Sequence, residues 1–160
     1  TLELSKVSEK KLDIHLMHSR PLSYIEQIKD LKNIEYITIH LEIEENIQNI
    51  LNKIKEYGFK RGISIKPNTD INKLIPYLDN IDLILIMTVE PGQGGQPFLE
   101  NSPTRIKEIK NLIKDKNILL EVDGGINDKT INLVNTADIA VVGSYITTSD
   151  NMIEKVKTLV

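Results

Sequence analysis

Acidic residues, histidines and glycines gather where apolar runs end, and these types suit acid–base chemistry, metal binding and phosphate binding. Asp123 ends an apolar run that begins at Ile118. Burying a carboxylate costs free energy unless the group is paired or bound to a metal. Asp123 is therefore the first candidate for a catalytic or metal-ligating residue, and a turn or helix-capping aspartate is the alternative.

Two histidines lie inside apolar segments. His15 stands between Ile14 and Leu16, so in an extended strand its side chain points away from both neighbours. Periodicity alone favours a partly buried, hydrogen-bonded histidine over a metal ligand, and the same holds for His40. His18 lies beyond its apolar run and is expected to face solvent.

Three glycine-containing segments could bring backbone N–H groups close to an anion. Residues 92–95 read Gly-Gln-Gly-Gly, and glycine permits the close approach and positive φ of an anion-binding nest. The pairs 124–125 (Gly-Gly) and 143–144 (Gly-Ser) follow apolar runs, at places where phosphate groups often bind. A mobile loop at 92–95 and tight turns at the two pairs are the alternatives.

The elements that must position these residues are predicted by six apolar runs. The runs are 12–17, 36–42, 62–66, 81–88, 118–123 and 138–143. The nearly continuous apolar character of 81–88 is typical of a strand buried on both faces of a parallel sheet.

Amphipathic stretches fill the intervals between the runs. Ile43, Ile47, Ile50, Leu51 and Ile54 share one helical face, and Gly58 follows as a stop. Further helices are predicted after Pro21, from Thr69-Asp70 to Pro76, after Ser102 as N-cap and Pro103 as first residue, after Asn127, and over 152–156.

The chain thus predicts six consecutive βα units of about 25 residues each. Such units build the doubly wound open sheet and the (β/α)₈ barrel. Both architectures place ligands at the carboxyl ends of the strands, where the polar residues collect.

Composition excludes several classes of function. The chain has 160 residues with a net charge of −3, no cysteine, five tyrosines, two phenylalanines and no tryptophan. These features exclude thiol chemistry and give no support to nucleic-acid binding. No apolar run approaches the roughly 20 residues of a membrane helix, and no signal peptide is visible. We expect a cytoplasmic protein that binds neither membranes nor nucleic acids.

The polar strand ends resemble the ribulose-phosphate 3-epimerase family. The matching segments are 12–17, 38–42, 62–69, 87–98, 121–126 and 142–144, in family order and over essentially the whole chain. The run Met-Thr-Val-Glu-Pro-Gly at 87–92 is highly specific. Gln93 departs from the phenylalanine of many members, with little expected consequence because the contact there is mostly through backbone.

This resemblance implies a (β/α)₈ barrel of the TIM type and metal-dependent epimerisation at C3 of a ketose phosphate, D-ribulose 5-phosphate to D-xylulose 5-phosphate. His15 and Asp123 become ligands of Zn²⁺, Fe²⁺, Mn²⁺ or Co²⁺, and Asp123 also becomes one acid/base carboxylate. Met17 and Met87 become walls of the active site. The substrate and its phosphate contact His15, Gly92, Gln93, Gly94, Gly95, Asp123, Gly124, Gly125, Gly143 and Ser144. His40 and Glu42 fit the family pattern without a direct role.

A barrel needs eight units, and only six are visible. We therefore expect residues 1–160 to form a single barrel domain that lacks its first two βα units, and with them the second acid/base aspartate. We also expect a homo-oligomer. The alternatives are an allulose 6-phosphate type of epimerase, a truncated, non-catalytic sugar-phosphate binder, and an open-sheet domain of the receiver type, whose early acidic cluster is missing.

Overall fold

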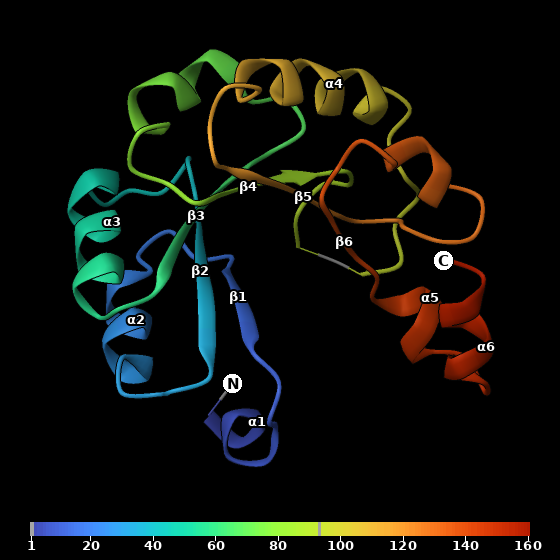
Figure 1. The fold of residues 1–160 in the computed structure, drawn as a ribbon, viewed down its shortest axis with the longest axis horizontal. Helices are drawn as coiled ribbons and strands as arrows, with labels where there is room; N and C mark the ends of the chain where they lie inside the picture. The colour runs from blue at the N-terminus through green and yellow to red at the C-terminus, as the bar shows by residue number, and fades with distance from the viewer. Residues whose placement is uncertain (1, 93) are drawn as a thin grey trace.

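The computed structural model describes residues 2–92 and 94–160, and its six parallel strands curl into a half-barrel (Figure 1). Each strand pairs with its neighbours in sequence, in the order β1-β2-β3-β4-β5-β6. The strands are β1 (Leu12–Leu16), β2 (Ile34–His40), β3 (Lys60–Ile65), β4 (Leu83–Met87), β5 (Leu119–Asp123) and β6 (Ile139–Val141). All six predicted strands are confirmed.

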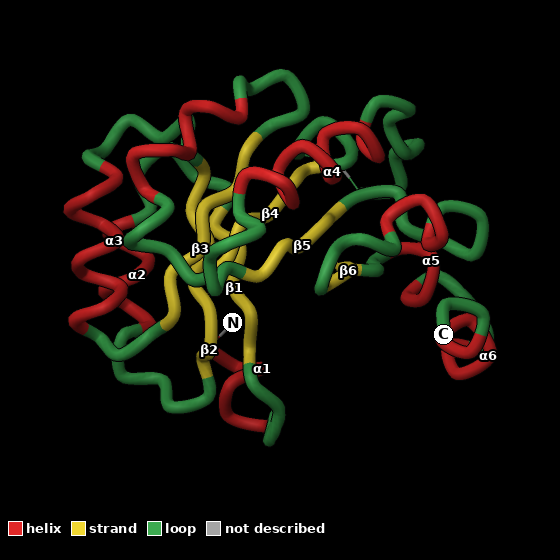
Figure 2. The backbone as a smooth tube through the Cα atoms, turned by 45° about the horizontal axis from the view of Figure 1, so that its top comes forward, coloured by secondary structure: helices red, strands yellow, loops and turns green. Residues whose placement is uncertain are grey.

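Helices form an outer arc around the strands (Figure 1). They are α1 (Leu2–Val7), α2 (Leu22–Ile28), α3 (Ile47–Glu56), η1 (Ile71–Tyr77), α4 (Ser102–Leu112), η2 (Ile131–Val134), α5 (Ser144–Thr147) and α6 (Met152–Lys157), of which η1 and η2 are 3₁₀ helices. The arc is open between α1 and α6, and β1 and β6 lie on either side of that opening (Figures 1 and 2). Among residues 2–92 and 94–160, none of the helices has the length and apolar character that a membrane-spanning segment requires.

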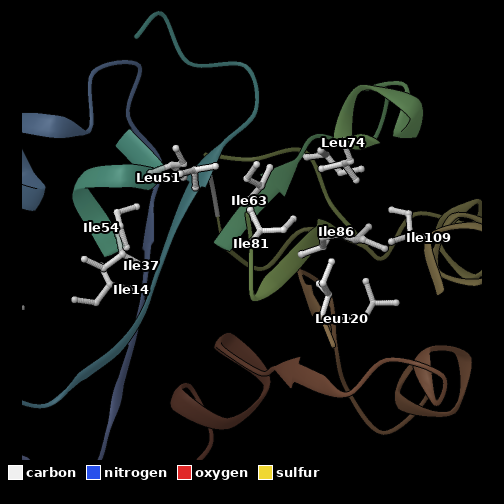
Figure 3. Packing of buried hydrophobic residues seen from close by; sticks show 14 of the residues in the cluster. Ile14, Ile37, Leu51, Ile54, Ile63, Leu74, Ile81, Ile86, Ile109 and Leu120 are labelled. Carbon is white, nitrogen blue, oxygen red and sulfur yellow. The ribbon is translucent and has the colours of Figure 1, made fainter. Parts of the chain in front are cut away.

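Residues on the outer face of the strands pack against the helices and form the main core. Ile37 and Ile63 of neighbouring strands meet Leu51 and Ile54 of α3, and all four are fully or almost fully buried (Figure 3). The inner face carries a second, smaller cluster that includes Leu83, Leu85 and Met87. Consequently β4 is buried on both faces, as its apolar run predicts.

Local signals place most helix ends, and several details differ from expectation. Asn46 caps α3 by accepting a hydrogen bond from the backbone N–H of Asn49, and Gly58 beyond its end has a φ of +85°. Ser102, predicted as an N-cap, is instead the first residue of α4 and is buried. The helix predicted from Thr69-Asp70 to Pro76 is a 3₁₀ helix over Ile71–Tyr77, so Pro76 lies inside it rather than at its end.

Candidate functional site

The carboxyl ends of the strands surround two adjoining cavities of about 240 and 200 Å³, which share Met17, Pro91 and Gly92. The smaller cavity brings together most of the predicted site. Its lining includes Met17, Met87, Gly92, Gly94, Gly95, Asp123, Gly124, Gly125, Gly143 and Ser144. Gln93 lies outside the described residues.

His15 and Asp123 face each other at the ends of β1 and β5. Nδ1 of His15 lies 3.9 Å from Oδ2 of Asp123, and the two side chains are 12% and 26% exposed. Among the described residues, Nδ1 has no hydrogen-bond partner although it is buried. An orphaned nitrogen beside a carboxylate fits a metal, because two ligands about 2.1 Å from one ion lie at most about 4.2 Å apart.

These two residues are only part of a ligand set. No group of three or more histidine, aspartate or glutamate side chains that could hold a metal occurs in the part of the chain that the structure describes. His15 and Asp123 could therefore contribute two ligands, a nitrogen and an oxygen, of the kind that Zn²⁺, Fe²⁺, Mn²⁺ and Co²⁺ accept.

A chain of contacts extends from His15 away from Asp123. Nε2 of His15 lies 2.9 Å from Nε2 of His40, and Nδ1 of His40 lies 3.3 Å from Oε2 of Glu42. The other oxygen, Oε1, accepts hydrogen bonds from the backbone N–H of Lys66 and the hydroxyl of Thr69. Burial opposes ionisation of Glu42, but the hydrogen bonds outweigh it and lower its pKa to about 2.

A pair of carboxyl groups lies on the inner face of the half-barrel. The side chain of Glu121 is 2% exposed, and its carboxyl group contacts that of Asp13. Burial raises the pKa of Glu121 to about 8, and the charges of Asp13 and Asp123 act in the same direction. Glu121 therefore keeps its proton to a higher pH than an ordinary glutamate does.

Glycine is required where β5 enters its loop. Gly125 has a φ of +65°, and a Cβ there would lie 2.7 Å from the backbone nitrogen of Phe98. Gly124 has a φ of +121°, and its carbonyl accepts a hydrogen bond from the hydroxyl of Thr88. The backbones of the two loops thus meet at the cavity wall, which no larger residue at 125 would allow.

The sequence supports a definite family assignment. The sequence profile of the Ribulose-phosphate 3 epimerase family matches residues 2–147. The chain belongs to this family. It is 39% identical over 147 residues to ribulose-phosphate 3-epimerase of Helicobacter pylori (strain J99), covering 89% of this chain and 67% of that relative. With the enzyme of Bacillus subtilis it shares 35% identity over 145 residues, covering 88% and 66%. The epimerase-family chain thus spans about two thirds of the length of these relatives.

Solved structures with little sequence similarity share the fold of this epimerase-family chain. Phosphoribosyl anthranilate isomerase from Thermococcus kodakaraensis superposes with a TM-score of 0.64 at 15% identity, over 98% of this chain and 76% of that one. A tryptophan synthase from M. tuberculosis gives a TM-score of 0.66 at 14% identity, over 99% and 61%. At these identities the likeness concerns the fold alone, and it confirms a partial barrel of the TIM type.

The partners of His40, Glu42 and Glu121 were not foreseen from the sequence, although a buried, hydrogen-bonded His40 was expected and is confirmed. Their signal is the two-residue period of a strand: His40 and Glu42 share a face, as do Glu121 and Asp123. That period indicates which side chains share a face but not which side chain on a neighbouring strand they meet.

Proposed function

We propose that this chain carries part of the active site of a metal-dependent epimerase that acts at C3 of a ketose phosphate, converting D-ribulose 5-phosphate to D-xylulose 5-phosphate. Membership of the epimerase family supports the reaction class. The observation that carries the proposal is the buried, unpartnered Nδ1 of His15 facing the Asp123 carboxylate beside a glycine-walled cavity.

His15 and Asp123 would hold a divalent metal, Zn²⁺, Fe²⁺, Mn²⁺ or Co²⁺. When bound, the metal supplies Lewis acidity that makes the proton next to the ketone easier to remove. His15 offers a neutral nitrogen to the site. Asp123 offers one carboxylate oxygen, and its second oxygen remains available to the substrate.

Asp123 would act as one of two acid/base groups. Its carboxylate takes the C3 proton on one face of the substrate, or delivers a proton to that face in the reverse direction. Inversion at C3 needs a second carboxylate on the opposite face of the substrate. Met87, buried beside the cavity, and Met17 on its rim would form apolar walls around the reacting carbons.

Backbone groups would hold the phosphate. Gly124, Gly125, Gly143 and Ser144 line one cavity, and glycine lets an anion approach backbone N–H groups closely. The sugar part of the substrate would contact His15, Gly92, Gly94, Gly95 and Asp123. An allulose 6-phosphate is the alternative substrate. The expected form of the protein is a cytoplasmic homo-oligomer.

One observation favours a second candidate function, sugar-phosphate binding without catalysis. The described residues supply two metal-capable side chains rather than the three or more of a complete site. A binding protein would need the glycine-walled cavity but not a complete set of acid/base groups.

Exchange of solvent deuterium tests the proposal. The chain is incubated with ribulose 5-phosphate and Mn²⁺ or Co²⁺ in D₂O, and incorporation at C3 is followed by NMR. We expect incorporation by the chain, its loss in Asp123→Asn, and normal incorporation in Asp115→Asn, which alters an exposed aspartate that lines neither cavity. Binding of the sugar phosphate without exchange would favour the second function, and neither binding nor exchange would overturn both.

A further inference from the structure

We propose that Glu42, acting through His40, is a positioning residue that fixes the tautomer of His15 and leaves the Nδ1 lone pair of His15 facing Asp123. The importance of this arrangement rests on the proposed function, in which His15 is a metal ligand. The arrangement of protons itself does not, because it follows from contacts within the chain.

The contact between His15 and His40 is a hydrogen bond in which a single proton lies between the two Nε2 atoms. Their Nε2 atoms lie 2.9 Å apart, which is hydrogen-bond distance, so one nitrogen donates and the other accepts. The pairing of β1 with β2 sets this contact: His15 lies opposite Thr38, and His40 lies two residues further along the same face. His40 is 6% exposed, so protein groups rather than water determine its protonation.

Glu42 decides the direction of that hydrogen bond. An ionised carboxylate only accepts, so Nδ1 of His40, 3.3 Å from Oε2, must carry the proton. A neutral His40 then has a lone pair on Nε2 and accepts from Nε2–H of His15. A neutral His15 with its proton on Nε2 has its lone pair on Nδ1, the atom that faces Asp123.

The loop after β3 holds Glu42 in the ionised, accepting state. The backbone N–H of Lys66 and the hydroxyl of Thr69 both donate to Oε1. The guanidinium of Arg105 donates to the carbonyls of the same two loop residues, at 3.3 and 2.8 Å. With its pKa lowered to about 2, Glu42 stays charged throughout the neutral range.

Replacing Glu42 by glutamine should reverse the whole chain of protons. The glutamine carbonyl oxygen is kept toward the N–H of Lys66, because the amide nitrogen cannot accept from it. The amide nitrogen then faces Nδ1 of His40 and donates to it. His40 must carry its proton on Nε2, His15 must accept there, and the proton of His15 moves to Nδ1, where it blocks the lone pair that faces Asp123.

Long-range ¹H–¹⁵N correlation of the histidine rings measures these tautomers directly in the chelator-treated protein at neutral pH. The chain has three histidines, so the signals are assignable by single replacements. We expect Nε2–H on His15 and Nδ1–H on His40, reversed in Glu42→Gln. Glu44→Gln, whose carboxylate pairs with exposed Arg20, is the matched control and should leave both unchanged.

A wild-type His15 protonated on Nδ1, or unchanged tautomers in Glu42→Gln, would overturn the inference; the wild-type spectrum decides even if the variant does not fold.

Zn²⁺ titration adds a second measurement, with binding expected to weaken about 10- to 100-fold in Glu42→Gln and not in Glu44→Gln. The predicted tautomers together with absent metal binding and absent deuterium exchange would overturn the proposed function alone. Zn²⁺ binding by a wild type with the opposite tautomer would overturn this inference alone.

Discussion

Replacing Glu121 by glutamine should change how the stability of the protein depends on pH. Glu121 is almost fully buried against Asp13, and its pKa is raised from 4.5 to about 8. Between these two values the native state holds a proton on Glu121 that the unfolded state has lost. Stability must therefore fall as pH rises through this window, by up to about 1.4 kcal/mol per pH unit.

Between pH 5.5 and 7.5 the pKa shift corresponds to a loss of about 2 to 3 kcal/mol in the free energy of unfolding. The variant Glu121→Gln cannot ionise and keeps a polar group of similar size beside Asp13. It should lack this part of the pH dependence, so its stability relative to wild type should rise by about 2 to 3 kcal/mol across the interval.

Urea unfolding at several pH values, with chelator present, measures the two curves. Glu100→Gln, at an exposed position, is the matched control and should run parallel to wild type. Parallel curves for wild type and Glu121→Gln would refute the reasoning, because they would mean that Glu121 is already ionised in the native protein at neutral pH.

Two further substitutions test the packing by urea unfolding, each against a matched control. Gly125→Ala should destabilise more than Gly58→Ala: both glycines have positive φ, which costs about 1–2 kcal/mol for alanine, but only at 125 would the new Cβ meet backbone, 2.7 Å from the nitrogen of Phe98. Equal losses would show that the collision relaxes freely. Ile84→Ala, in the core, should cost about 2–5 kcal/mol, whereas Ile153→Ala, exposed on α6, should change stability by less than about 0.5 kcal/mol. Similar effects at the two positions would contradict the assignment of the core.

The strands were predictable because strands buried in a parallel sheet consist of nearly continuous apolar residues. The apolar run 81–88 contains β4, which has the interior on both sides. The type of the helix before Pro76 and the start of α4 were less predictable, because propensity does not separate a 3₁₀ from an α turn or fix the first residue of a helix. The helix α1 has no clear apolar face in the sequence and was not predicted.

Individual candidate residues of the site could be named from the sequence, but their arrangement could not. The cost of burying a carboxylate pointed to Asp123 and the family motif to His15, and the half-barrel brings the two together. The contact of His15 with His40 depends on the register between two strands, and that of Glu42 with Thr69 depends on the path of a loop. The spacing of residues along one segment determines neither the register between strands nor the path of a loop. These contacts therefore could not be predicted from the sequence and are seen only in the structure.

The neighbour-to-neighbour order of the sheet bears on how the chain folds. Each strand finds its partner roughly 20 to 40 residues away, as when Leu12 pairs with Ile34 and Met87 with Asp123, so no pairing has to wait for the far end of the polypeptide. Each closing loop is of similar length and adds a similar entropic cost. During synthesis the sheet can therefore form strand by strand, in the order in which the strands leave the ribosome. When β2 is synthesised, β1 is already present, and each later strand pairs with the free edge of the strand before it.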